Sequence, residues 1–200
     1  MTYSENILFR RLCRWLIRWR HRCGYGIHSP FAFQFVTGVI YETTPYYAYS
    51  SLSSTLTAHT FYGAAYDRQS GMLEKDLCLL FRLANFCHPH RMVLWGNVGQ
   101  AAQYLHAPGL RRDAAPSLVT LFYADSPFDL HLPSPDADDE ALTDGSMVIV
   151  RNIHQDERTA KVWNQLKSRP DVTLTFDIGR LGMALRNDKL NRQDYIVAYF

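Results

Sequence analysis

The sequence predicts an α/β domain whose central sheet is parallel in its first part and ends in an antiparallel hairpin. Short apolar runs at 91–95, 117–124 and 146–150 alternate with segments of helical periodicity. This alternation is typical of parallel strands joined by crossover helices. Two further apolar runs, at 172–178 and 183–185, are separated only by a short glycine-containing turn, which indicates a hairpin.

Length and composition are those of a globular chain. The protein has 200 residues, of which 47% are hydrophobic and 20% charged, and its net charge is +2. This charge excludes a strongly basic or acidic protein. No apolar run reaches the roughly 18 residues that a transmembrane helix needs, and arginines interrupt the first apolar stretch, unlike in a signal peptide. The four cysteines form no C-x-x-C pair, so we expect reduced thiols and a cytoplasmic location.

The first segment has the pattern of a basic amphipathic helix over residues 5–22. Apolar residues recur at helical spacing on one face, and arginines gather on the other. The apolar positions are Leu8, Leu12, Trp15, Leu16 and Trp19, and the basic positions are Arg10, Arg11, Arg14, Arg18 and Arg22. Such a helix either packs its apolar face on the main domain, which we favour, or binds anionic lipid or nucleic acid through its arginines.

Residues 1–70 are predicted to form an N-terminal helical arm and a linker, and residues 71–200 the α/β domain. Ser29 is a suitable N-cap for a second helix, with Pro30 at its first position. Residues 43–70 have no clean period and are interpreted as a loop or linker. In the second part we expect helices at 72–87 and 155–167, and a last strand at 195–200.

The turn after residues 91–95 is the clearest candidate for a ligand site. The segment RMVLWGNVGQAAQYL places Gly96, Asn97 and Gly99 between a strand and a helix. Such a turn presents backbone N–H groups at the start of a helix, where the charged part of a nucleotide-like ligand binds. Asp125 follows the next strand, and the carboxyl ends of parallel strands meet at one edge of a sheet.

Three segments resemble class I S-adenosylmethionine-dependent methyltransferases, and within them a bacterial subgroup related to small-molecule O-methyltransferases. GYGIHSPFAFQFV is similar to the arm of that subgroup, LLFRLANFCHPHRMVLWGNVGQ to its helix and first strand, and DGSMVIVRNIHQDERTAKVWNQLKSRPDVTLTFDIGRLGMAL to its fifth to seventh strands. The resemblance implies a truncated Rossmann-like sheet and, in an active member, S-adenosylmethionine held by Gly96, Asn97, Gly99 and Asp125.

The chain departs from this family in its cofactor residues and in its length. Trp95 stands where active relatives carry the acid that ends the first strand. Only 17 residues separate Gly99 from Ser117, whereas the family places two further βα units there, each of about 30 residues. The strand at 117–124 is therefore either the family's fourth strand, which we favour, or its second, with Asp125 as the ribose ligand.

The resemblance also implies the position of a metal. Metal-dependent relatives hold a divalent cation with an Asp after the fourth strand and an Asp-Asn pair after the fifth. Asp125 and Asn152 match two of these ligands, but Arg151 stands at the third position. A guanidinium repels the cation and is able to pair with Asp125 itself. We therefore predict no metal site.

Three hypotheses about function follow. The first is a degenerate methyltransferase-like protein, a pseudoenzyme without a cofactor whose role is structural or depends on an unknown protein partner or on self-association. The second is an active methyltransferase for a small hydroxylated or aromatic substrate. His154 would then be the catalytic proton acceptor, although the sequence identifies no partner for it. The third, least favoured, is binding of an anionic surface through the arginines of residues 5–22.

Overall fold

The computed structural model describes residues 26–54, 58–61, 64–67, 70–113, 118–132, 134 and 142–199. The helix predicted at 5–22 lies outside these residues. In the described ranges, no helix combines the length and the apolar character that crossing a membrane requires.

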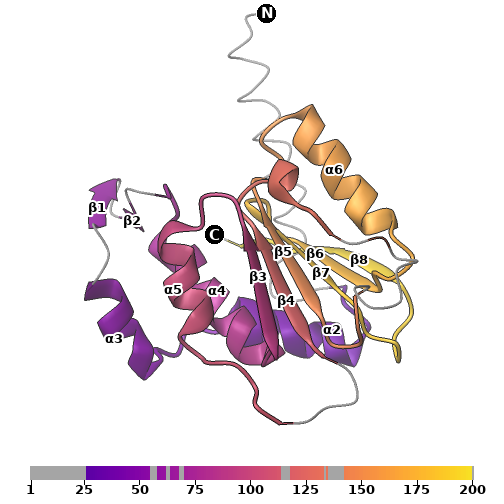
Figure 1. The fold of residues 1–200 in the computed structure, drawn as a ribbon, viewed down its shortest axis with the longest axis horizontal. Coiled ribbons are helices and arrows are strands. Elements are labelled where there is room, and N and C mark those ends of the chain that lie inside the picture. Colours follow the sequence, from indigo (N-terminus) through magenta and orange to yellow (C-terminus); the bar gives the residue numbers. More distant parts are fainter. Residues whose placement is uncertain are drawn as a thin grey trace, which may run out of the picture.

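A mixed sheet of six strands forms the centre of the fold, in the order β3-β4-β5-β7-β6-β8 (Figure 1). The strands are β3 (Arg91–Trp95), β4 (Thr120–Ala124), β5 (Met147–Arg151), β6 (Leu174–Asp177), β7 (Leu181–Leu185) and β8 (Gln193–Ile196). β3, β4 and β5 are parallel neighbours, whereas β7 runs antiparallel between β5 and β6. The predicted α/β class, the parallel first part and the closing hairpin are thereby confirmed. β8 completes the chain's own sheet, parallel to β6.

Two helices of the α/β part begin and end close to their predicted bounds, α4 (Glu74–Cys87) and α6 (Glu157–Ser168). A third, α5 (Gly99–His106), follows the turn after β3, where a helix was expected. Local signals determine where they start and stop. At the start of α6, Asp156 accepts a hydrogen bond from the Thr159 backbone N–H at 2.7 Å, and the Thr159 hydroxyl oxygen accepts one from the Asp156 N–H at 3.0 Å. α4 ends at His88, whose φ of 43° is left-handed.

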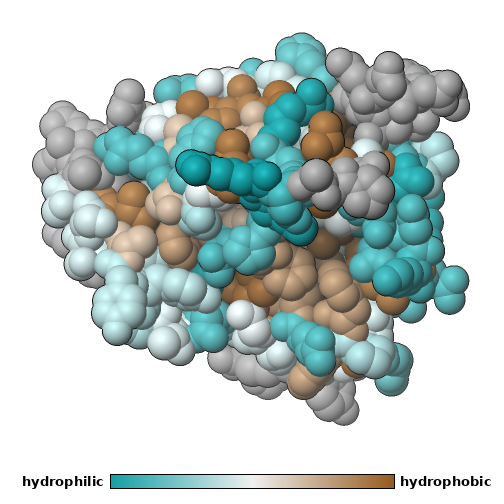
Figure 2. All heavy atoms as spheres, turned by 60° about the horizontal axis from the view of Figure 1, so that its bottom comes forward, coloured by the Kyte–Doolittle hydropathy of each residue, from teal (hydrophilic) through white to brown (hydrophobic). Residues whose placement is uncertain are grey.

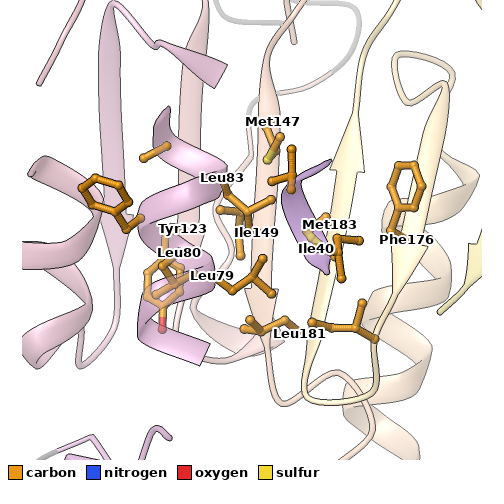
Figure 3. Packing of buried hydrophobic residues seen from close by; sticks show 14 of the residues in the cluster. Ile40, Leu79, Leu80, Leu83, Tyr123, Met147, Ile149, Phe176, Leu181 and Met183 are labelled. Atoms are coloured by element: carbon orange, nitrogen blue, oxygen red, sulfur yellow. The ribbon is translucent and has the colours of Figure 1, made fainter. Parts of the chain in front are cut away.

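Helices cover both faces of the sheet. On one face Trp163 and Leu166 of α6 pack on Phe122, Val148 and Val150. The other face carries the larger hydrophobic cluster, in which α4 packs on alternate residues of the same strands (Figure 3). Its members in the figure include Leu79, Leu80, Leu83, Tyr123, Met147, Ile149 and Met183. This two-sided burial is the reason why the parallel strands are continuous apolar runs.

Residues 30–40 of the predicted arm belong to this larger cluster. α2 (Pro30–Phe35) begins as predicted, with the Ser29 hydroxyl oxygen accepting from the Ala32 N–H at 3.3 Å, and continues into a π-helix, η2 (Val36–Ile40). Phe35 is 1% exposed, and its ring centroid lies 4.6 Å from that of Phe176 in β6. The arm therefore shares one core with the sheet over these residues.

The interpretation of residues 43–70 as a loop without regular structure was wrong. The segment contains α3 (Tyr47–Ser54) and a hairpin of β1 (Ala58–Phe61) and β2 (Ala64–Asp67). Tertiary contacts outweigh the weak helical propensity of the serine-rich α3, because Tyr46 and Tyr49 pack against Phe81 of α4, with ring centroids 5.1 and 5.3 Å from it.

The surface is mixed in character. On the face shown in Figure 2, hydrophobic residues gather in patches among hydrophilic ones. The exposed large apolar side chains of the described residues include Phe33, Phe86 and Leu118. Phe86 contacts Phe31 and Phe35 edge to face, so one side of this aromatic group is buried and the other reaches solvent.

Candidate functional site

The candidate site lies at the carboxyl ends of the parallel strands β3, β4 and β5. Trp95 ends β3, Asp125 follows β4, and Arg151 ends β5. The parallel register, in which Trp95 pairs with Ala124 and Ala124 with Val150, brings these ends level. Ligands of open α/β sheets bind at this edge. The structure thus brings Gly96, Asn97, Gly99 and Asp125 to one edge, as predicted.

The turn between β3 and α5 depends on Gly96, whose φ is 84°. The 3-10 helix η3 (Pro127–Asp129), which follows β4, folds over this turn. A Cβ atom placed on Gly96 would lie 2.3 Å from Oδ2 of Asp129 and 3.2 Å from Cβ of Asp125. The Asp129 carboxylate therefore occupies the space into which a side chain at position 96 would point.

Trp95 belongs to an apolar cluster on the α6 face of the sheet. Its indole stacks on Phe122, with ring centroids 5.6 Å apart and an interplanar angle of 16°. His131 contacts it edge-on at 6.3 Å, and Leu130 packs against the same cluster. The end of β3 thus carries an aromatic ring that packs on Phe122. It offers no carboxylate for the ammonium group of a cofactor.

Arg151 and Asp125 form an ion pair, as the sequence predicted. Nη1 of Arg151 lies 2.8 Å from Oδ1 of Asp125, and the two side chains are only 14% and 18% exposed. The Tyr123 hydroxyl donates to the same carboxylate oxygen at 3.2 Å. Burial, with the Asp125 charge beside it, raises the pKa of Tyr123, so the phenol stays neutral and able to donate.

The arrangement around Asp125 does not fit a divalent cation. Arg151 already neutralises the carboxylate, and the Asn152 amide donates to the Asp125 backbone carbonyl at 3.4 Å. A metal ligand must offer its oxygen, and this amide presents its NH₂ group instead. Within the described ranges, no group of three His, Cys, Asp or Glu side chains could hold a metal ion.

His154 has a partner that the sequence did not identify. Nε2 of His154 lies 2.5 Å from Oδ2 of Asp177, and the side chains are 26% and 14% exposed. Asp177 ends β6, and its other oxygen accepts from the Gly179 N–H at 2.8 Å. The carboxylate thereby fixes the orientation of the imidazole. Asp177 ends β6, and His154 lies shortly after the end of β5. These positions near strand ends are the only signal in the sequence that the two residues are close.

A second buried carboxylate was also missed. Asp76, in the first turn of α4, is 3% exposed and pairs with Arg180, whose Nε lies 2.9 Å from its Oδ2. Burial raises the pKa of Asp76, and the positive charge of Arg180 opposes that rise. The Arg180 carbonyl accepts the Asn152 N–H at 2.7 Å, which connects α4, the β6–β7 turn and the candidate site. No sequence pattern indicates a contact over this separation.

Comparisons with protein families, with curated proteins and with solved structures find no match to this chain.

The Gly96→Ala variant is expected to lower the free energy of unfolding by about 2 kcal/mol, because it adds a close contact with Asp129 to the strain of a positive φ. Gly109 is the matched control. It has the same φ of 84°, and a Cβ there would have no atom within 4 Å. Gly109→Ala should therefore cost only about 1 kcal/mol. Chemical denaturation of both variants measures the two losses in the free energy of unfolding. Equal losses would show that Asp129 makes no destabilising contact with a side chain at position 96.

Proposed function

We propose that this protein is a degenerate S-adenosylmethionine methyltransferase-like protein that has lost its cofactor and acts as a structural or partner-binding protein. The observation that carries the proposal is that the chain's own side chains occupy or pair with the groups that would hold the cofactor. Asp129 lies over Gly96, the Trp95 indole takes the place of the acid, and Arg151 pairs with Asp125. These residues do not fit the cofactor, because no carboxylate stands at the end of β3 for its ammonium group and the Asp125 carboxylate is held in an ion pair.

The sheet order supports the interpretation that two βα units are missing. β4 pairs with both β3 and β5, which is the place of the fourth strand in the doubly wound order 3-2-1-4-5-6. In that order the second strand lies on the opposite side of the first strand. Among the described residues no strand pairs with that edge of β3. The described residues therefore lack the strands that would contact the adenosine. This absence is expected if residues 117–124 are the family's fourth strand.

Titration calorimetry of the full chain with S-adenosylmethionine tests the proposal. We expect no binding up to about 1 mM, which corresponds to about −4 kcal/mol. The Asp129→Ala variant is the matched control, because it opens the space over Gly96 without restoring the acid or the missing units. It should also fail to bind. A micromolar dissociation constant for either protein would overturn the proposal.

One observation favours the second candidate, an active methyltransferase for a small hydroxylated or aromatic substrate. His154 is oriented by Asp177, which is the arrangement of a general base and its supporting carboxylate. If turnover of such a substrate exists, His154→Ala abolishes it without unfolding the chain. Asp177→Asn, which keeps the side-chain size and removes the charge, should weaken it. Turnover that is unchanged in His154→Ala excludes this role for the histidine.

A further inference from the structure

A second candidate site lies away from the strand ends, in a cavity of about 550 Å³. Three segments that are far apart in the sequence enclose it: residues 40–45 with Tyr49 of α3, the first half of α4, and Tyr199 near the end of the chain. The Tyr41 hydroxyl donates to the Ala198 carbonyl, and the Tyr199 hydroxyl to the Lys75 carbonyl at 2.9 Å. The volume is in the range of cavities that hold small organic molecules.

A buried guanidinium forms one wall of this cavity. Arg82 is only 7% exposed. It donates from Nε to the Val39 carbonyl at 2.7 Å, from Nη2 to the Ile40 carbonyl at 3.2 Å, and from Nη1 to the Tyr49 hydroxyl at 3.4 Å. The two carbonyls lie at the end of η2, so Arg82 also caps that helix and gains partial compensation for its charge. All three acceptors are neutral groups.

Other shielded arginines of the described chain each have an aspartate: Arg151 pairs with Asp125, and Arg169 with Asp171. The more exposed Arg180 pairs with the buried Asp76. Arg82 makes no ion pair with any carboxylate that the structure describes, although it is the most deeply buried of the four. A buried charge without a counter-ion is costly, and a guanidinium is shaped to bind a carboxylate with two hydrogen bonds.

The remaining wall is aromatic and carries charged side chains of both signs. Lys75 lies over the ring of Tyr199, with Nζ 5.1 Å from the ring centroid, and burial together with Arg180 lowers the pKa of this lysine. Glu42 and Glu74 also line the cavity. Glu42 is partly exposed, and its carboxylate accepts the Thr44 N–H at 2.6 Å. These acids repel a dianion more strongly than a monoanion.

We propose that this cavity binds a small organic monocarboxylate with an aromatic or aliphatic body, and that its carboxylate contacts Arg82. The tyrosine rings and the apolar residues Ile40 and Leu73 contact the body. The proposal is independent of the strand-end crevice and holds whether or not S-adenosylmethionine binds there.

Naphthylacetate is a suitable probe, with naphthylacetamide as its uncharged counterpart of the same shape. We expect the full chain to bind the acid more tightly than the amide by roughly ten- to a hundredfold, the range for hydrogen bonds to a charged group. Naphthalene fluorescence measures both affinities. Equal affinities, or no binding of the acid, overturn the proposal.

Cys78 lines the cavity and locates the bound probe. Naphthylacetate should slow alkylation of Cys78 by iodoacetamide several-fold, as measured by peptide mass spectrometry. Cys87 on the same helix does not line the cavity, so its alkylation is the internal control. Burial raises the pKa of both thiols, to about 11 and about 12, and the reaction is therefore run at alkaline pH. Equal protection of both cysteines, or of neither, places the probe elsewhere and contradicts the proposal.

Two variants complete the test. Arg82→Gln keeps a donor for the η2 carbonyls and removes the charge, so the preference for the acid over the amide should disappear. If this variant does not fold, the comparison of the two probes and the alkylation of Cys78 decide the outcome on the unchanged chain. A chain extended by a short glycine segment after Phe200 should bind equally well. Binding only by the extended chain would show that the chain's own terminal carboxylate occupies the site, which overturns the proposal.

Discussion

The Phe35→Ala variant is expected to lower the free energy of unfolding by about 3–5 kcal/mol, the range for removing a buried aromatic ring. Phe35 is 1% exposed and contacts Phe176 of β6 as well as Phe86 of α4. Its removal leaves a cavity between the arm and the sheet. Chemical denaturation followed by circular dichroism and by tryptophan fluorescence measures the loss.

Phe33 on the same helix is the matched control, because its side chain is 46% exposed. Phe33→Ala should cost less than about 1 kcal/mol. Because residues 30–40 share the core of the sheet, we expect both probes to report one cooperative transition in the unchanged chain and in the variant. A small loss in Phe35→Ala, or an arm that unfolds separately from the sheet, would show that the arm is an independent unit.

The Arg151→Ala variant is expected to lower the free energy of unfolding by about 3 kcal/mol, because it leaves the Asp125 carboxylate shielded from water without its counter-ion. Asp125 then keeps only the Tyr123 hydroxyl as a side-chain donor among its described contacts. The matched control is Arg111, whose ion pair with Asp113 has a similar length but side chains that are 41% and 53% exposed. Arg111→Ala should cost less than about 1 kcal/mol.

A double-mutant cycle separates the ion pair from other effects of the substitution. If the pair behaves as one unit, Arg151→Ala and Asp125→Ala together should cost about 2 kcal/mol less than the sum of the single variants. Urea melts of the unchanged chain and of the three variants at neutral pH provide the four free energies of the cycle. Additive losses would mean that Arg151 contributes by packing alone and would contradict the stabilising role of the ion pair.

Local patterns were sufficient to predict most of the secondary structure. The Ser29-Pro30 start of α2, the end of α4 before Pro89 and the turn between β6 and β7 are short-range features, and each depends on the conformation of a few adjacent residues. The failure over residues 43–70 has a physical reason as well. Helix α3 has little apolar periodicity of its own, and it is held by the contacts of Tyr46 and Tyr49 with α4.

The candidate site was predicted in part. Glycines in a βα turn, and acids after strands, identify the edge of the sheet where they meet, because parallel strands align their carboxyl ends. The resemblance to metal-dependent relatives placed Arg151 beside Asp125 and allowed them to pair, and the structure shows this ion pair. The position of Asp129 over Gly96 was not predictable, because it depends on how the loop after β4 folds back.

The amino-acid sequence by itself determined the α/β class, the order of helices and strands in the second part of the chain, and the absence of an acid at position 95. These features depend on residue type and on periodicity within short segments. Only the tertiary structure decided that His154 contacts Asp177, that Asp76 contacts Arg180, and that Arg82 lines a cavity without an aspartate. Such contacts join residues that are distant in the chain, and a local pattern contains no information about which distant segment packing brings to it.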